Sequence, residues 1–141
     1  MQSTDPPVIV EENFTASVSA LWHALSAVNE MTKWFFENIS DFKAEVGFDT
    51  EFIVENEGRV FPHLWKVTEA IPEKRLTLEW KYGGYPGLSF VTFELENLPK
   101  GSRLRVIHTI TEDFPQDVPE FSRKNCQGGW DWFISESLKG Y

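Results

Sequence analysis

The chain has 141 residues, and 22 acidic against 13 basic side chains leave it with a formal net charge of −9. This length is typical of one domain that buries its own core. The charge argues against binding to nucleic acid or to an anionic membrane surface, because both need clustered lysine and arginine. The single cysteine excludes an internal disulfide. No leader peptide and no stretch of membrane-span length is recognisable, so we expect a cytoplasmic protein without membrane insertion.

The first elements of the chain are a strand and two short helices. Residues 8–14 predict the strand, and Ser17 then offers an N-cap to the first helix. The apolar residues of this helix follow at i, i+3, i+4 and i+7, and they are Val18, Leu21, Trp22 and Leu25. Asn29 can cap the second helix, whose apolar face carries Met31, Trp34 and Phe35.

From residue 39 onward the apolar residues recur with a period of two, which predicts β-strands. We expect six consecutive strands separated by turns, over residues 42–46, 51–55, 59–67, 75–82, 91–96 and 103–110. Pro62 cannot donate to a β-ladder, so its strand is bulged or lies at an edge near that residue. Consecutive strands on short turns form an antiparallel meander.

The last predicted element is a helix over residues 126–138 with two glycines near its start. Its apolar stripe consists of Cys126, Trp130, Phe133, Ile134 and Leu138. Gly128 and Gly129 each cost the helix about 1 kcal/mol relative to alanine, which calls for a reason. They could bend the helix around a cavity, mark its true start, or let it pack closely on the sheet. We favour close packing.

The element order is therefore β-α-α-β-β-β-β-β-β-α, without an internal repeat or a linker, which predicts one α+β domain over residues 1–141. A single long helix after a large sheet covers the apolar face of that sheet. In a meander, alternate turns lie at the same end, so the loops 56–58, 83–87 and 112–120 share one end. Because the latter two are longer than tight turns require, we expect a rim around an opening there.

Three motifs give the chain a family resemblance over essentially its whole length. They are Ala16–Leu25 in the first helix, Met31–Phe35 in the second, and Gly129-Trp130 with Phe133, Ile134 and Leu138 in the last. In order and spacing they resemble the START-like superfamily (SRPBCC, helix-grip), which includes polyketide cyclases and lipid-transfer domains. Within it, the chain is similar to the C-terminal domain family of the heat-shock-protein ATPase activator. The resemblance implies a curved antiparallel sheet wrapped around a long C-terminal helix, and an apolar cavity between them.

The side chains in the inward phase of these elements are the candidate ligand-binding residues. They are Trp34, Phe61, His63, Trp65, Trp80, Tyr82, Phe93, His108, Cys126 and Trp130. Large aromatic side chains with a few hydrogen-bonding groups are typical of a binding pocket. A filled core is at least an equal alternative for each residue taken alone.

His63 and His108 are the sharpest polar candidates, since an inward histidine can bind a polar group or act as a general acid or base. We favour the alternative that each is a buried histidine bonded to a neighbour. Cys126 has no adjacent base in the sequence, so we expect a small buried hydrophobic residue rather than a nucleophile. Neither metal-ligand spacing nor a nucleotide-binding loop is present, so we predict no metal and no cofactor.

The leading functional hypothesis is a binding module whose apolar cavity holds a hydrophobic small molecule or a lipid. One alternative is a chaperone-associated or stress-response interaction protein, as the family resemblance implies. Another is a cyclase- or hydrolase-like enzyme that uses His63 or His108 as base and Tyr82 as donor. Both a monomer and a homodimer are compatible with the sequence, and Trp132 lies off the apolar stripe, where it could face a partner.

Overall fold

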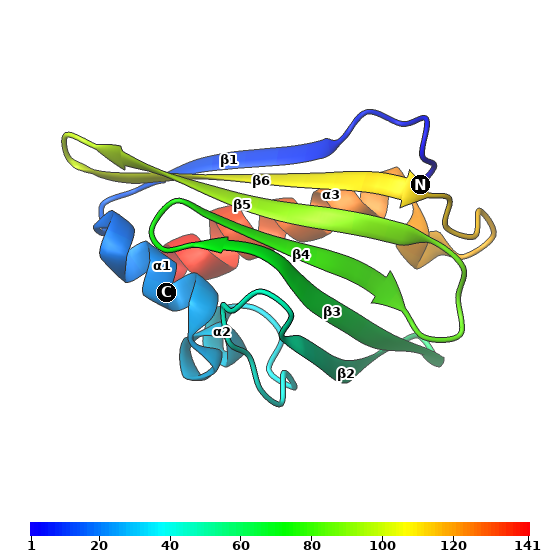
Figure 1. Ribbon diagram of the computed structural model, residues 1–141. Helices are drawn as coiled ribbons and strands as arrows, with labels where there is room; N and C mark the ends of the chain where they lie inside the picture. The colour runs from blue at the N-terminus through cyan, green and yellow to red at the C-terminus, as the bar shows by residue number, and fades with distance from the viewer.

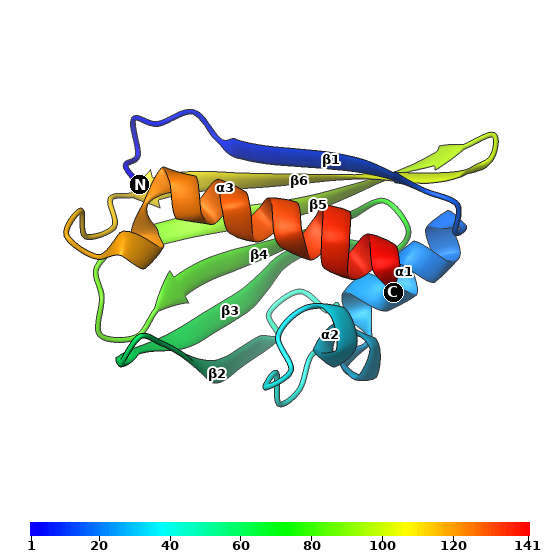
Figure 2. The same cartoon turned by 180° about the vertical axis from the view of Figure 1, so that it is seen from behind.

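Six antiparallel strands form one curved sheet, and a long C-terminal helix runs across its concave face (Figures 1 and 2). The structure is a computed structural model that describes all residues from 1 to 141. Its elements are β1 (Val8–Phe14), α1 (Val18–Ser26), α2 (Val28–Trp34), β2 (Asp49–Asn56), β3 (Arg59–Ile71), β4 (Arg75–Tyr82), β5 (Leu88–Leu98), β6 (Gly101–Glu112), the 3-10 helix η1 (Pro119–Phe121), α3 (Arg123–Asp131) and the π-helix η2 (Trp132–Leu138). The strands lie in the order β1-β6-β5-β4-β3-β2. The predicted α+β helix-grip fold is confirmed.

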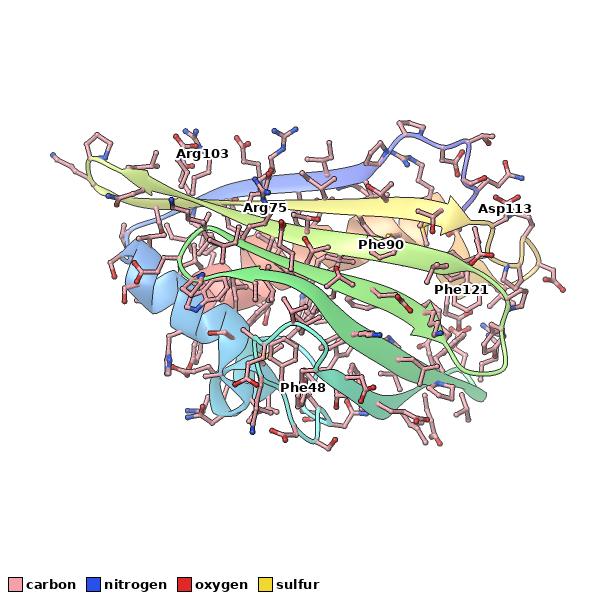
Figure 3. The ribbon with its side chains drawn as sticks, viewed as in Figure 1. Phe48, Arg75, Phe90, Arg103, Asp113 and Phe121 are labelled. Atoms are coloured by element: carbon pink, nitrogen blue, oxygen red, sulfur yellow. The ribbon has the colours of Figure 1, made fainter.

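The alternation of apolar and polar residues decides which side of each strand faces the helix. In β4, the buried residues Leu76, Leu78 and Trp80 alternate with exposed or half-buried polar residues. Arg75 and Phe90 stand on the outer face of the sheet, on the side away from α3 (Figure 3). The inner face therefore carries the apolar surface that the helices bury, and burying it is the main source of stability.

One predicted strand is wrong. Residues 42–46 form a loop, so the sheet has six strands rather than seven. Their backbone hydrogen bonds are local, as in the bond from Glu45 N–H to the Lys43 carbonyl. The period of two arises because Phe42 packs against Trp65 in the core while Val46 is 69% exposed. The burial of Phe42 thus produced a strand-like sequence pattern in a segment that forms no hydrogen bonds with a neighbouring strand.

The C-terminal helix begins earlier than predicted and changes its winding. Ser122 caps it at Arg123 by accepting a hydrogen bond from the Asn125 N–H (3.2 Å). In an α-helix, side chains four residues apart are separated by about 40° more than a full turn, so a stripe with this spacing slowly rotates around the helix. The following π-helix has more residues per turn, which reverses this rotation. The change keeps residues spaced by four on the side of the sheet, namely Cys126, Trp130, Ile134 and Leu138. None of the helices has the length and apolarity needed to cross a membrane.

The two glycines of this helix do not pack against the sheet. A Cβ atom added at Gly128 or at Gly129 would meet no atom within 4 Å. The helix starts five residues before Gly128, so the glycines do not mark its start either. The close packing that we favoured is wrong, and Gly129 instead borders open space beneath the helix.

The loops 56–58, 83–87 and 112–120 gather at one end of the sheet, as predicted. Asn56 and Arg59 both donate hydrogen bonds to Glu120, and Tyr85 stacks on Phe61 with ring centroids 5.3 Å apart. This end also holds a separate apolar cluster of Met1, Phe61, Ile110, Phe114 and Phe121. The cluster fills only part of this end, because a groove between β2 and α3 opens beside it and is lined by Asn56 and Glu120 of these loops.

Candidate functional site

A cavity of about 170 Å³ lies between the sheet and α3. Its lining is mostly aromatic and includes Phe35, Phe36, Trp80, Tyr82, Trp130 and Phe133. A groove of about 520 Å³ continues it toward β2 and shares His63, Tyr82, Glu120, Asn125, Gly129 and Phe133 with it. The missing side chain at Gly129 leaves room where the two spaces meet. The helix therefore stands off the sheet at this position instead of closing on it.

The structure brings most of the candidate residues to this cavity and leaves the others in the packed core. Those that line the cavity are His63, Trp80, Tyr82, His108, Cys126 and Trp130. Phe61 lines the adjoining groove. Trp34, Trp65 and Phe93 belong to the main core instead, and the indole N–H of Trp34 donates to the Ala24 carbonyl at 2.8 Å.

Sequence reasoning missed several lining residues. Phe36, Glu120 and Asn125 lie outside the regular elements or on the polar side of a helix, where no period marks them. Phe35 and Phe133 were placed on apolar faces but not assigned to the cavity. Phe35 stacks on Trp34 and contacts Phe133 edge to face, with centroids 4.7 and 4.9 Å apart.

His108 is the centre of a hydrogen-bonded chain that joins three strands to α3. The Ser89 hydroxyl donates to the Trp80 carbonyl (2.7 Å), so it must accept from the Nε2–H of His108 (2.8 Å). This fixes the tautomer and leaves Nδ1 as an acceptor. Nδ1 lies 3.1 Å from the donating Nε1 of Trp130 and 3.4 Å from Sγ of Cys126. Both nitrogens of His108 are therefore occupied.

The contact between Cys126 and His108 corrects the expectation that no base lies near the cysteine. A thiol beside an imidazole becomes a nucleophile when the pair is ionised. Here burial lowers the pKa of His108 to about 4 and raises the pKa of the Cys126 thiol to about 12. Both groups are neutral at pH 7, so the thiol acts as a weak donor in a structural network.

His63 differs from His108 because one of its nitrogens is free. Its Nδ1–H donates to the Phe61 carbonyl at 2.9 Å, which leaves Nε2 as an acceptor without a hydrogen bond. Burial lowers the pKa of His63 to about 4, so the ring is neutral at pH 7. Tyr82 is its cross-strand partner, with ring centroids 4.8 Å apart. The two histidines do not stack on one another, and each packs against Trp80.

Two further polar groups at the cavity have unused hydrogen-bonding capacity. The Nε1–H of Trp80 is buried without a partner. The Tyr82 hydroxyl makes no hydrogen bond of acceptable geometry, although it lies near enough to Trp80 for the indole to oppose the rise in the phenol pKa that burial causes. Buried polar groups are rarely left without partners. His63, Tyr82 and Trp80 all line the cavity, where His63 offers an acceptor and Tyr82 a hydroxyl, while the buried N–H of Trp80 lies behind the Tyr82 hydroxyl.

Comparison with known proteins identifies the family. The profile described as activator of Hsp90 ATPase homolog 1-like protein matches residues 15–141. The chain belongs to this family. No protein of curated function is significantly similar in sequence.

Solved structures with the same fold cover nearly the whole chain. A crystal structure of a protein from Mesorhizobium loti is 26% identical, covers 95% of this chain and 94% of its own, and has a TM-score of 0.74. One from Rhizobium loti is 18% identical, with coverages of 95% and 94% and a TM-score of 0.79. The solution structure of the Aha1 dimer from Colwellia psychrerythraea is 22% identical, with coverages of 94% and 92% and a TM-score of 0.69.

The charged side chain at the cavity of this activator-like protein is an acidic one that is paired with a basic partner. Glu120 lies at the junction of cavity and groove, where Arg59 (2.9 Å) and Asn56 (2.8 Å) donate to it. Hydrogen bonding from Arg59 lowers the pKa of Glu120, so the carboxylate is ionised at pH 7. No lysine or arginine lines either space. No group of three or more His, Cys, Asp or Glu side chains is arranged as a metal site.

Proposed function

We propose that the protein is a binding module that holds a small, largely apolar molecule between its sheet and α3. The observation that carries this proposal is the cavity itself, whose aromatic lining includes the free Nε2 of His63 and the unpartnered N–H of Trp80. Apolar pockets with a few convergent polar groups are the usual form of small-molecule sites. A lipid chain could enter by the same groove, since Val54 and Phe61 line it.

The position of Gly129 supports the same proposal. Glycine weakens a helix by about 1 kcal/mol relative to alanine, and no close contact at this position requires it. Any larger side chain would project into the junction between cavity and groove. The glycine keeps that passage open.

Replacing Gly129 with leucine should therefore block ligand uptake. We expect the variant Gly129→Leu to weaken the binding of a neutral dye such as Nile red at least about tenfold, because overfilling a packed site costs about 1–3 kcal/mol. Fluorescence titration measures the affinity and the 1:1 stoichiometry.

Gly128→Leu is the matched control. It removes a glycine from the same helix and also meets no atom within 4 Å, but Gly128 is exposed and lines neither space. It should leave dye binding unchanged. Equal effects of both substitutions, or no saturable binding to the unaltered protein, would show that the cavity is not a binding site.

The family match favours a second function, which is association with the chaperone Hsp90. The family takes its description from an activator of Hsp90 ATPase, and the Trp132 side chain, 56% exposed, offers an aromatic anchor for a partner. We expect Trp132→Ala to weaken binding to purified Hsp90 about tenfold. Tyr141→Ala, at another exposed aromatic residue (52%), is the control.

Co-sedimentation and ATP-hydrolysis assays with Hsp90 measure this effect. Absence of both binding and stimulation at micromolar concentrations would contradict the association. A second copy of the chain is the other candidate partner for the surface around Trp132, since the Colwellia psychrerythraea neighbour is described as a dimer. It would double the mass seen by sedimentation when Hsp90 is absent.

The geometry gives the enzyme hypothesis less support. His108 has no free nitrogen for proton transfer. His63 has one free nitrogen, but a pKa of about 4 makes it a weak base at pH 7. The free nitrogen of His63 and the Tyr82 hydroxyl are better suited to bind a polar group than to transfer its proton.

A further inference from the structure

The unused polar groups of the cavity define a ligand class, and this inference rests on the proposed binding function. We propose that the cavity selects an uncharged molecule with a flat apolar body and a hydroxyl group. That hydroxyl donates to Nε2 of His63 and accepts from the Tyr82 hydroxyl, while the Nε1–H of Trp80 stabilises the Tyr82 oxygen. The ligand group thus completes a chain of hydrogen bonds that the protein alone leaves open.

His63, Tyr82 and Trp80 are neighbours in the lining of the cavity. The ring centroid of His63 lies 4.8 Å from that of Tyr82 and 5.7 Å from that of Trp80. His63 and Tyr82 are direct neighbours across β3 and β4. Both side chains also line the cavity, so one ligand group at this place in the lining would meet both.

The fixed tautomer of His63 requires the ligand to donate. Its Nδ1–H is committed to the Phe61 carbonyl, so Nε2 offers a lone pair to the cavity. A ligand carbonyl or ether oxygen, which only accepts, would face this lone pair without a proton between them. The Tyr82 hydroxyl can both donate and accept, so it adapts to a ligand group that does both.

The surroundings also favour an uncharged ligand. A carboxylate would approach the lone pair of neutral His63 and the ionised Glu120, and no basic side chain lines the cavity to offset it. The only positive charge at the lining is the ammonium group of Met1, which donates to the Phe121 carbonyl at 2.7 Å, and the ionised Glu120 lies at the same lining. Burying an unpaired charge costs far more than burying a hydroxyl that is fully hydrogen-bonded.

The aromatic side chains that line the cavity favour a ligand with a flat apolar body. The rings of Phe36 and Phe133 contact each other edge to face, and Trp130 meets Trp80 in the same way, with centroids 5.0 and 5.7 Å apart. Such walls accept another aromatic ring in stacked or edge-on contact.

Four probes with the same ring system separate these requirements: 2-naphthol, 2-methoxynaphthalene, naphthalene and 2-naphthoate. We expect the unaltered protein to bind 2-naphthol about tenfold more tightly than each of the other three, because only the neutral hydroxyl completes the hydrogen bonds. Quenching of tryptophan fluorescence, checked by native mass spectrometry, measures the affinities.

The substitution Tyr82→Phe removes one oxygen atom from the cavity and should abolish the advantage of 2-naphthol over naphthalene. Tyr85→Phe is the control, because the Tyr85 hydroxyl lies 3.4 Å from the Val60 carbonyl and lines neither the cavity nor the groove. It should leave the advantage intact.

Equal binding of 2-naphthol and naphthalene to the unaltered protein would overturn the selection of a hydroxyl while leaving the binding module standing. Tightest binding of 2-naphthoate would overturn the requirement for a neutral ligand. If no probe and no Nile red binds, the binding module itself is refuted. The probe series on the unaltered protein decides these cases even if Tyr82→Phe fails to fold.

Discussion

We expect the free energy of unfolding to fall by about 6 kcal/mol as the pH is lowered from 7 to 4, because two buried histidines must take up protons on unfolding. Burial lowers the pKa of His63 and of His108 from the ordinary 6.5 to about 4. Between these values the unfolded chain binds more protons than the folded one. Each histidine thus contributes stability above pH 6.5 that is lost as the pH falls toward 4, about 3 kcal/mol in each case. A loss of this size approaches the whole stability of a typical domain.

Urea denaturation at pH 7, 6, 5.5 and 5 tests this expectation. The stability should fall by up to about 1.4 kcal/mol per pH unit for each buried histidine, and His63→Phe should halve the slope. The carboxylates whose pKa values are lowered by hydrogen bonds, such as Glu12 and Glu120, lose their contribution only below their ordinary value of 4.5. The window from 6.5 to 5 therefore isolates the histidines, and constant stability across it would contradict their burial as neutral rings.

The architecture was predictable from the sequence because each strand is half buried. The period of two in β4 follows directly from one face meeting the core. The same rule failed at residues 42–46, where Phe42 enters the core from a loop. The π-helix could not be predicted, since its cause is packing: residues spaced by four from Cys126 to Leu138 must all face the sheet.

The site was predictable only in part, because a strand pattern shows which side chains point inward but not how far they lie from the helix that covers them. It showed that His63, Tyr82 and His108 point inward, but whether α3 closes on them depends on how far the helix stands off. The contact between Cys126 and His108 depends on how α3 is placed along β6, which no local pattern encodes. Ser89 was missed because its strand begins at Leu88, earlier than the predicted start at residue 91.

Replacing His108 with phenylalanine should lower the free energy of unfolding at pH 7 by about 3 kcal/mol. Phenylalanine keeps a flat ring but is larger than histidine by about one methylene group, so some overpacking strain adds to the loss of hydrogen bonds. The substitution leaves the buried Nε1–H of Trp130 without an acceptor and removes the donor to Ser89. Each buried polar group that loses its partner costs about 1–3 kcal/mol. Urea denaturation measures the loss, and His63→Phe, which removes one hydrogen bond instead of three contacts, should cost less.

The same variant tests whether the folded protein holds His108 as a neutral ring, through the pH dependence of the free energy of unfolding. The unaltered protein loses the contribution of this histidine as the pH falls to 4, whereas the phenylalanine variant has no such contribution to lose. The stability difference between the two should therefore shrink by about 3 kcal/mol between pH 7 and pH 4. A difference that stays constant with pH would mean that His108 is not held as a neutral ring. Because the neutral ring is what accepts from Trp130 and donates to Ser89, a constant difference would also contradict the hydrogen-bonded chain that joins α3 to the sheet.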